Sequence, residues 1–304
     1  MNTCYSPTPS RDPHIGHAWV AWMNWQAARR SGGDFVVLWD DISYANGRCE
    51  QSGWSLETGI ARTREQLTWL GLAPDREGRW SDHYDAGREA AETLGYKMPR
   101  TIGALPTLHD FVPAMRESLQ PYGALYEPAL MALWVVGEAR ERIEGYYTGM
   151  DFIGTAAFYH DVCRRLGLRP PLKSYLPCVR RERVPEKESK SRGAVSIEDL
   201  RLAGFEPWQI ISTLRECDRI SRRDHMADLV IPEGVLEEDP DEAAFTRSVT
   251  TGKHCRGWLE YLGDVDDVAS CLNSYGPMNF EPELKRYFAS VFTTNADRQA
   301  GVFG

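Results

Sequence analysis

The sequence lacks the features that mark membrane-spanning, secreted and repetitive proteins. No window approaches the ~18 uninterrupted apolar residues that a transmembrane helix needs. The N-terminus has no basic start followed by an apolar stretch, so we expect no secretory signal. Internal repeats and low-complexity segments are absent as well. We therefore expect a cytoplasmic globular protein without a membrane partner.

Cysteine and positive charge are also scarce. The seven cysteines are an odd number and form no Cys-x-x-Cys pair, so neither a disulfide framework nor a zinc site is expected. Lysine and arginine total 35 against 44 aspartates and glutamates, and the net charge of -9 argues against a protein that coats nucleic acid non-specifically. The composition is otherwise that of a globular protein, 42% apolar and 26% charged, and 304 residues allow two domains.

The N-terminal residues carry the pattern of a strand, a helix and a second strand. Residues 4–9 form a short predicted strand that runs into a proline-rich loop. Residues 17–30 have three tryptophans on one helical face, and Ser31-Gly32-Gly33 ends that helix. Residues 34–39 form an apolar run that fits a strand buried on both faces of a parallel sheet. This βαβ unit predicts an open α/β sheet.

Helical periodicity continues along the chain. Helices are predicted at 54–72, 84–94, 108–119 and 154–166, a strand at 172–179, and either a strand or a helix at 129–139. Ser196 and Asp199 form a capping box that begins another helix, and the rest is mostly helical in pattern. The charge-dense stretch 180–191 is interpreted as a surface loop. The predicted fold is a parallel sheet with helices on both faces, followed by a mostly helical C-terminal region.

Two histidines flank a glycine between the first predicted strand and the first predicted helix. The motif reads Asp12-Pro13-His14-Ile15-Gly16-His17. Ligands of open α/β sheets bind outside the carboxyl ends of the strands, and a helix N-terminus there offers N–H groups and a positive dipole end to phosphate. His14 and His17 are therefore candidate phosphate-binding residues, although a capped helix with two half-exposed histidines shows the same pattern.

A second candidate lies on the charged loop, in the run Lys187-Glu188-Ser189-Lys190-Ser191-Arg192-Gly193. Two lysines three residues apart can bind the phosphates of a polyphosphate chain while they leave as pyrophosphate. A solvated charge run has the same composition, so this motif gains weight only in combination with the first.

Together the two motifs resemble the paired signatures of class I aminoacyl-tRNA synthetases, His-Ile-Gly-His near the N-terminus and Lys-x-Ser-Lys-Ser after the last sheet strand. Three further passages are similar to the glutamyl-tRNA synthetase group: the opening segment 6–16, the helix 63–72 that ends in Trp-Leu-Gly-Leu, and the passage 190–207. The resemblance covers most of residues 3–215.

This resemblance implies a Rossmann-like catalytic domain over residues 1–195, with a shortened insertion at about 80–129, and a helical stem-contact-like and C-terminal region over 196–304. It implies an adenylate-forming ligase: ATP and an amino acid, or a similar carboxylate, give an aminoacyl-adenylate and pyrophosphate. Such catalysis rests on positioning and charge stabilisation. ATP and Mg²⁺ are the implied cofactors, without zinc or another protein-bound metal.

The resemblance also assigns roles to residues that would contact ATP. His14 and His17 would stabilise the phosphates and the transition state, and Lys187 and Lys190 would close over the β- and γ-phosphates. The remaining ATP contacts would come from Gly16 beneath adenine, Asp151 at the ribose, the backbone of Cys178 and Val179 at adenine, and Ser189.

The amino-acid site departs from the family. The resemblance places amino-acid contacts at Cys4, Ser6, Asp40 and Tyr147, with Asp40 facing the α-amino group. The glutamyl group holds the substrate's side-chain carboxylate with two arginines, but those positions are Cys4 and Tyr147 or Thr148 here. A carboxylate enclosed without an arginine is costly, so a smaller or less charged amino acid or an unusual carboxylate is favoured over glutamate. A one-residue gap that brings in Arg140 or Arg142 is the alternative.

Length is the second departure. Only residues 80–129 stand where the family inserts an acceptor-stem-binding subdomain, and the chain after the lysine loop is too short for a large anticodon-binding domain. Short glutamyl-queuosine synthetases also lack that domain. They usually carry a cysteine-rich zinc site in the insertion, and no cysteine occurs here between Cys49 and Cys163.

Three functional classes remain open. The first is an enzyme that passes its activated amino acid to an acceptor other than a conventional whole tRNA: a modified nucleoside in RNA or DNA, a carrier protein or a small molecule. The second is a non-catalytic synthetase paralogue that binds nucleic acid or protein. The third is a discrete glutamyl-tRNA synthetase or a glutamyl-queuosine-type enzyme. Because both ATP signatures are present, the sequence favours an enzyme.

Overall fold

The computed structural model describes residues 1–45, 53–96, 98, 100, 128–149, 152, 156–176, 179–181, 194–223, 228–231 and 250–252. The predicted helix at 108–119 lies outside these residues, as does the loop stretch 182–193. None of the helices in the described ranges is long and apolar enough to cross a membrane.

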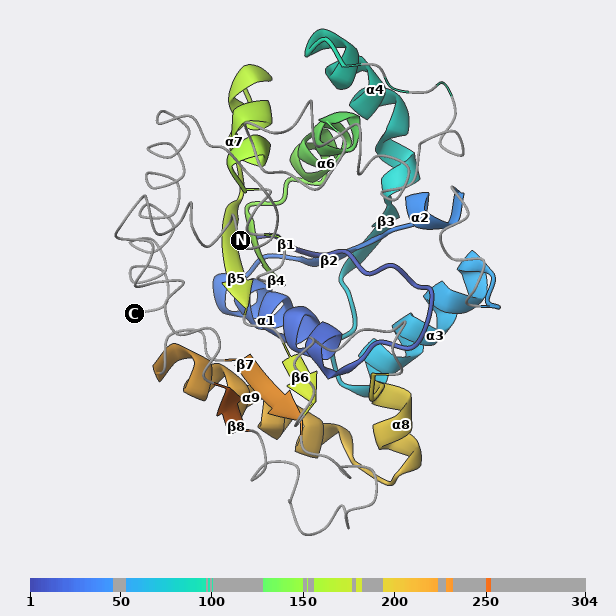
Figure 1. Cartoon of the computed structure of the whole chain (residues 1–304), viewed down its shortest axis with the longest axis vertical. Coiled ribbons are helices and arrows are strands. Elements are labelled where there is room, and N and C mark those ends of the chain that lie inside the picture. Colours follow the sequence, from blue (N-terminus) through green and yellow to red (C-terminus); the bar gives the residue numbers. More distant parts are fainter. Residues whose placement is uncertain are drawn as a thin grey trace.

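Parallel strands form the centre of the molecule (Figure 1). Strands β1 (Thr3–Tyr5), β2 (Phe35–Trp39) and β3 (Arg76–Arg79) pair in parallel in the order β1-β2-β3. Strand β4 (Gly145–Gly149) pairs in parallel with β5 (Leu172–Leu176). The N–H groups of Glu144 and Gly145 donate to the Asn2 carbonyl oxygen at 2.9 and 3.4 Å, so β4 lies beside β1. The strands thus follow the order β3-β2-β1-β4-β5, which confirms the predicted parallel α/β architecture.

Helices cover both faces of these strands. One face carries α1 (Ile15–Ser31), α3 (Leu56–Trp69), α8 (Ile197–Leu202) and α9 (Pro207–Arg223), and the other carries α4 (Tyr84–Thr93), α6 (Pro128–Arg140) and α7 (Ala156–Arg165). The short helix α2 (Ile42–Ala45) follows β2, and a 3-10 turn, η2 (Trp80–His83), precedes α4. Residues 129–139, for which the sequence allowed either a strand or a helix, therefore form a helix.

Alternation along the strands divides the core in two. Tyr5, Val37 and Trp39 belong to the first core, which packs against α1, α3, α8 and α9. Cys4, Val36 and Leu38 belong to the second core, which packs against α4, α6 and α7. Every residue of β2 is buried, as its apolar sequence predicts.

Buried Asn24 ties α1 to the neighbouring strands. Its side chain is fully buried, and its Nδ2 donates to the Tyr147 carbonyl oxygen while its Oδ1 accepts from the Tyr147 N–H, both at 2.9 Å. The backbone of β4 is thereby fixed to the helix that follows β1. At its other end α1 stops at Gly32 in the left-handed conformation, φ 67°, where the sequence predicted the stop.

A small second sheet departs from the mostly helical pattern that the sequence predicts after residue 196. Strand β6 (Val179–Arg181) pairs in parallel with β7 (Asp228–Ile231), which pairs antiparallel with β8 (Thr250–Gly252). The charged residues Arg180 and Arg181 therefore belong to a strand, where the sequence predicted a loop. The predicted capping box of α8 is confirmed, because Ser196 Oγ accepts from the Asp199 N–H and the Asp199 carboxylate accepts from the Ser196 N–H.

Candidate active site

The histidine motif lies where β1 leads into α1. His14 is the N-cap of α1, and its Nδ1 accepts from the Gly16 N–H at 3.0 Å. An imidazole whose Nδ1 accepts a hydrogen bond carries its proton on Nε2. His14 therefore offers a donor at Nε2 and is held by its own helix.

His17 lies one turn further along, against His14. The two ring centroids are 3.9 Å apart and the ring planes meet at 55°. The first turn of α1 contains no acidic residue. Two imidazoles at a helix N-terminus whose first turn carries no carboxylate form a group of donors suited to phosphate.

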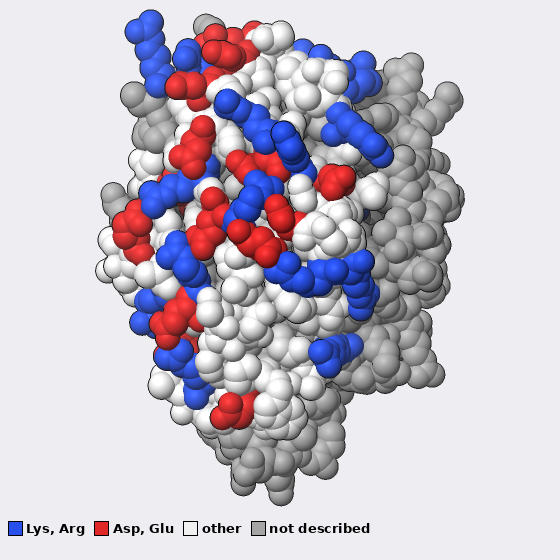
Figure 2. All heavy atoms as spheres, turned by 180° about the vertical axis from the view of Figure 1, so that it is seen from behind, with Lys and Arg blue, Asp and Glu red and all other residues white. Residues whose placement is uncertain are grey.

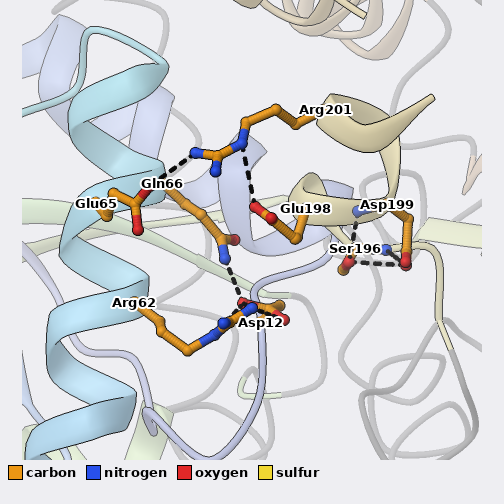
Figure 3. Close-up of polar contacts among 8 residues, drawn as sticks. All are labelled: Asp12, Arg62, Glu65, Gln66, Ser196, Glu198, Asp199 and Arg201. Atoms are coloured by element: carbon orange, nitrogen blue, oxygen red, sulfur yellow. Dashed lines mark hydrogen bonds and ion pairs between the residues drawn. The ribbon is translucent and has the colours of Figure 1, made fainter. Parts of the chain in front are cut away.

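Neighbouring elements hold this segment from two sides. Arg62 of α3 donates to both oxygens of Asp12, and Gln66 Nε2 donates to Asp12 Oδ1 (Figure 3). On the other side, the Ile197 N–H at the start of α8 donates to the Pro13 carbonyl oxygen at 2.8 Å. The turn that presents the histidines is thus fixed to α3 and α8.

Helix α3 approaches the loop after β1 closely. A Cβ on Gly59 would lie 1.7 Å from the Pro9 carbonyl oxygen and 3.0 Å from the Tyr44 hydroxyl. A side chain at position 59 would therefore push α3 away from this loop, and only glycine permits the observed contact.

Asp40 follows β2 at the same edge of the sheet. Its carboxylate accepts from the Thr8 hydroxyl, from Ser43 Oγ at 2.8 Å and from the Ser43 N–H at 3.3 Å. Its own N–H donates to the Pro7 carbonyl oxygen at 3.0 Å. These contacts fix the direction of the carboxylate, which makes Asp40 a rigid acceptor next to the loop after β1.

The other residues predicted for the amino-acid site are separated. Ser6 is exposed, and its Oγ accepts from Trp80 Nε1 at 2.6 Å. Cys4 is 4% exposed in the second core, and burial is the main cause that raises the pKa of its thiol. Tyr147 belongs to the first core instead. The structure therefore brings Ser6 and Asp40 to the loop edge but does not bring the side chains of Cys4 and Tyr147 together.

Several predicted ATP-site residues lie outside the described part of the chain: Asp151, Cys178, Lys187, Ser189 and Lys190. Val179 begins β6, and its predicted contact is through the backbone. Gly16 lies in the first turn of α1 beside the histidines.

A buried group of polar side chains was not predicted from the sequence. Glu138 of α6 accepts hydrogen bonds from the hydroxyls of Tyr146 and Tyr159, and the Lys173 Nζ lies 3.0 Å from the centroid of the Tyr159 ring. Burial lowers the pKa of Lys173, and the charge of Glu138 opposes that shift. A lysine inside a predicted strand carries no sequence signal of burial, so only the fold reveals this group.

The surface offers no large area of one charge on the face seen in Figure 2, where basic and acidic side chains alternate. Many charged side chains of the described residues form ion pairs, among them Arg29–Asp75, Arg64–Glu77 and Arg76–Glu141. Among the described residues, no group of three or more histidine, cysteine, aspartate or glutamate side chains is arranged to hold a metal ion.

Comparison with known proteins finds relatives of the N-terminal region. Residues 1–97 match the family model for class I tRNA synthetases (E and Q), catalytic domain. Glutamate–tRNA ligase 2 of Cereibacter sphaeroides is 40% identical over 92 residues, which cover 30% of this chain and 19% of that protein. Glutamate–tRNA ligase of Azospirillum brasilense is 33% identical over 146 residues, 46% of this chain and 30% of the relative.

A longer match extends beyond that region. Glutamate–tRNA ligase 1 of Rhodospirillum rubrum is 27% identical over 270 residues, 69% of this chain and 59% of the relative, so the chain spans less than two thirds of each of these relatives. The crystal structure of a glutamate tRNA ligase from Elizabethkingia meningosepticum in complex with its amino acid has the same fold. Its TM-score is 0.50 at 13% identity, covering 98% of this chain and 79% of that one. Residues 1–97 are therefore similar to the catalytic domain of class I tRNA synthetases (E and Q), and the chain has an α/β Rossmann-like fold.

Proposed function

We propose that the protein activates an amino acid, or a similar carboxylate, with ATP. A carboxylate oxygen of the substrate attacks the α-phosphorus of ATP, the bond from that phosphorus to the bridging oxygen breaks, and pyrophosphate leaves. The product is an aminoacyl-adenylate, which is then passed to an acceptor. The family match of residues 1–97 supports this reaction class.

The single observation that carries the proposal is the pair of imidazoles at the start of α1. They lie 3.9 Å apart at the carboxyl end of β1, which has β2 on one side and β4 on the other. The chain passes from β1 to β2 on one side and later from β3 to β4 on the other side of β1, so the strand order reverses here, and such points are the usual ligand sites of open α/β sheets. His14 and His17 donate to the phosphate oxygens and stabilise the negative charge that develops there.

The remaining roles follow the family resemblance. Lys187 and Lys190 bind the β- and γ-phosphates, Mg²⁺ accompanies ATP, and Asp40 accepts from the α-amino group of the substrate. The rest of the ATP site comprises Gly16, Asp151, Cys178, Val179 and Ser189, and the rest of the amino-acid site comprises Cys4, Ser6 and Tyr147. In this proposal residues 1–195 form the catalytic domain and residues 196–304 a helical stem-contact-like region.

The acceptor separates two versions of the proposal. The missing substrate-binding arginines favour an acyl group other than glutamate, and the shortened insertion at 80–129 favours an acceptor other than a conventional whole tRNA. The names of the relatives favour glutamyl transfer to tRNA. Incubation with radiolabelled glutamate and total tRNA distinguishes them, because only the second version predicts acid-precipitable label on tRNA.

Amino-acid-dependent exchange of pyrophosphate into ATP tests the activation step itself. We expect exchange in the wild type and its loss in His17→Ala and Lys190→Ala, with the fold retained by circular dichroism. His160→Ala, a change on α7 away from α1, is the matched control and should keep the activity. If the wild type shows no exchange with any amino acid, with or without RNA, the catalytic proposal fails and a non-catalytic binding role takes its place.

A further inference from the structure

Three polar side chains on one face of α3 connect the histidine turn to α8. Arg62, Glu65 and Gln66 are spaced at i, i+3 and i+4, so they project from the same side of the helix. Two of them bind Asp12, and the third binds Arg201 (Figure 3). We call these three residues with their partners Asp12 and Arg201 the α3 brace.

The Asp12 side of the brace is dense in contacts. Arg62 Nε and Nη2 donate to Asp12 Oδ1 at 3.2 and 3.1 Å, and Nη2 also donates to Oδ2 at 2.9 Å. Gln66 adds a further donor to Oδ1. The guanidinium group of Arg62 lies 4.7 Å from the centroid of the Trp54 ring, which restricts its orientation. Asp12, two residues before His14, therefore has little freedom.

The Arg201 side of the brace fixes α8 to the same helix. Arg201 Nη1 donates to Glu65 Oε1 at 2.8 Å, and its Nε lies 3.4 Å from Glu198 Oε2. Helix α8 in turn contacts the histidine turn, because the Ile197 N–H donates to the Pro13 carbonyl oxygen. An isolated antiparallel β-bridge also pairs His14 with Ser196. Both supports of the histidine turn thus meet on α3.

Stability alone does not explain this arrangement. The side chains of Arg62 and Arg201 are 41% and 34% exposed, and ion pairs at such positions contribute little to the free energy of unfolding. Their geometry, by contrast, constrains the turn that carries both imidazoles, and small displacements of positioned groups change rates strongly.

We propose that Arg62 and Gln66 are positioning residues, which act through Asp12 to set His14 and His17 against the reacting phosphate. This inference rests on the proposed ATP-dependent activation. The Glu65–Arg201 contact supports the same turn from α8. None of these side chains needs to touch the substrate.

Arg64 provides a matched control on the same helix. Its side chain is 47% exposed and makes a two-donor contact to Glu77 at 2.8 and 2.7 Å, but it does not contact Asp12. We expect Arg62→Gln to lower kcat of pyrophosphate exchange by about tenfold or more while the KM for ATP changes little, because positioning acts in the transition state. Arg64→Gln should keep wild-type kcat.

Arg62→Lys should restore part of the loss, and Asp12→Asn combined with Arg62→Gln should be no slower than either single variant.

A second readout does not depend on activity. NMR of ring-labelled histidine, with signals assigned from single His→Gln variants, should show the His14 and His17 resonances shifted in Arg62→Gln and unchanged in Arg64→Gln. Shifted resonances in a protein whose wild type shows no exchange would uphold the brace and reject the proposed function. Equal kcat and equal histidine spectra in Arg62→Gln and Arg64→Gln would overturn the brace, whatever the wild-type activity.

Discussion

The two faces of the central strands differ in where their charged side chains lie. On the face of α1, α3 and α8, the core is apolar and the charged side chains stand at its edge, half-exposed and paired, around the histidine turn. On the face of α4, α6 and α7, Glu138 and Lys173 are 5% and 8% exposed, surrounded by tyrosines and cysteines. The first face uses charge to fix geometry at the surface, whereas the second buries charge inside the fold.

This difference indicates that substitutions on the two faces have different consequences. Exposed pairs contribute little to stability but can orient a turn, while a buried charge that loses its partner destabilises the whole domain. Changes to the exposed ion pairs of the first face should therefore alter activity before stability, and changes to the buried charges of the second face stability before activity.

The largest expected effect is on the second face. Glu138→Ala removes the acceptor of two tyrosine hydroxyls and leaves Lys173 buried without an opposing charge, so we expect a loss of about 3–5 kcal/mol in the free energy of unfolding. Urea denaturation measures it. The control is Glu141→Ala, immediately after the end of α6, whose side chain is 24% exposed and which should cost about 1 kcal/mol.

A compensating change sharpens this prediction. Glu138→Leu with Lys173→Met removes both charges together, and it should be more stable than Glu138→Ala. If Glu138→Ala unfolds at the same urea concentration as Glu141→Ala, the buried charges do not distinguish the two faces.

A smaller effect is expected at Asn24, between α1 and β4. Asn24→Ala leaves the buried N–H and carbonyl of Tyr147 without the partner side chain, which should cost about 1–3 kcal/mol. Gln26→Ala, two residues along α1, should change the unfolding midpoint little. Equal midpoints for the two variants would contradict the role of Asn24 as the link between the helix and β4.

The smallest effect concerns pH. Burial lowers the pKa of His83, while the nearby Glu141 carboxylate opposes that shift. His83 therefore binds a proton more tightly in the unfolded chain than in the folded one. Between the lowered pKa of His83 and about pH 6.5, the free energy of unfolding should rise with pH. His83→Gln should flatten the pH dependence of the unfolding free energy in that window. An unchanged slope would show that His83 is not perturbed by the second core.

The sequence predicted those parts of the fold in which apolar residues follow a clear period. β1, α1 and β2 appear where expected, because their patterns match burial on one or both faces. β3 was missed, because Arg76–Arg79 has a polar sequence and its place is fixed by contacts of Arg76 with Asp34 and Glu141. β4 was missed as well, since the hydrogen bond from its Tyr147 N–H to Asn24 joins two residues that lie far apart in the chain.

The candidate site was predictable to a similar extent. His14 and His17 form a short local motif, and the structure places their rings together. The α3 brace joins Asp12 to Arg62 across 50 positions of sequence, and a charged residue on a helix carries no indication of its partner. The separation of Cys4 and Tyr147 into two cores likewise follows from strand alternation and helix placement, which a motif does not contain.

Exchange of labelled pyrophosphate into ATP by the wild-type protein, measured with each amino acid in turn and with and without RNA, tests the central claim most directly. The account predicts exchange that depends on at least one amino acid and is lost in His17→Ala. No exchange under any of these conditions, or equal exchange in the wild type and His17→Ala, would contradict it.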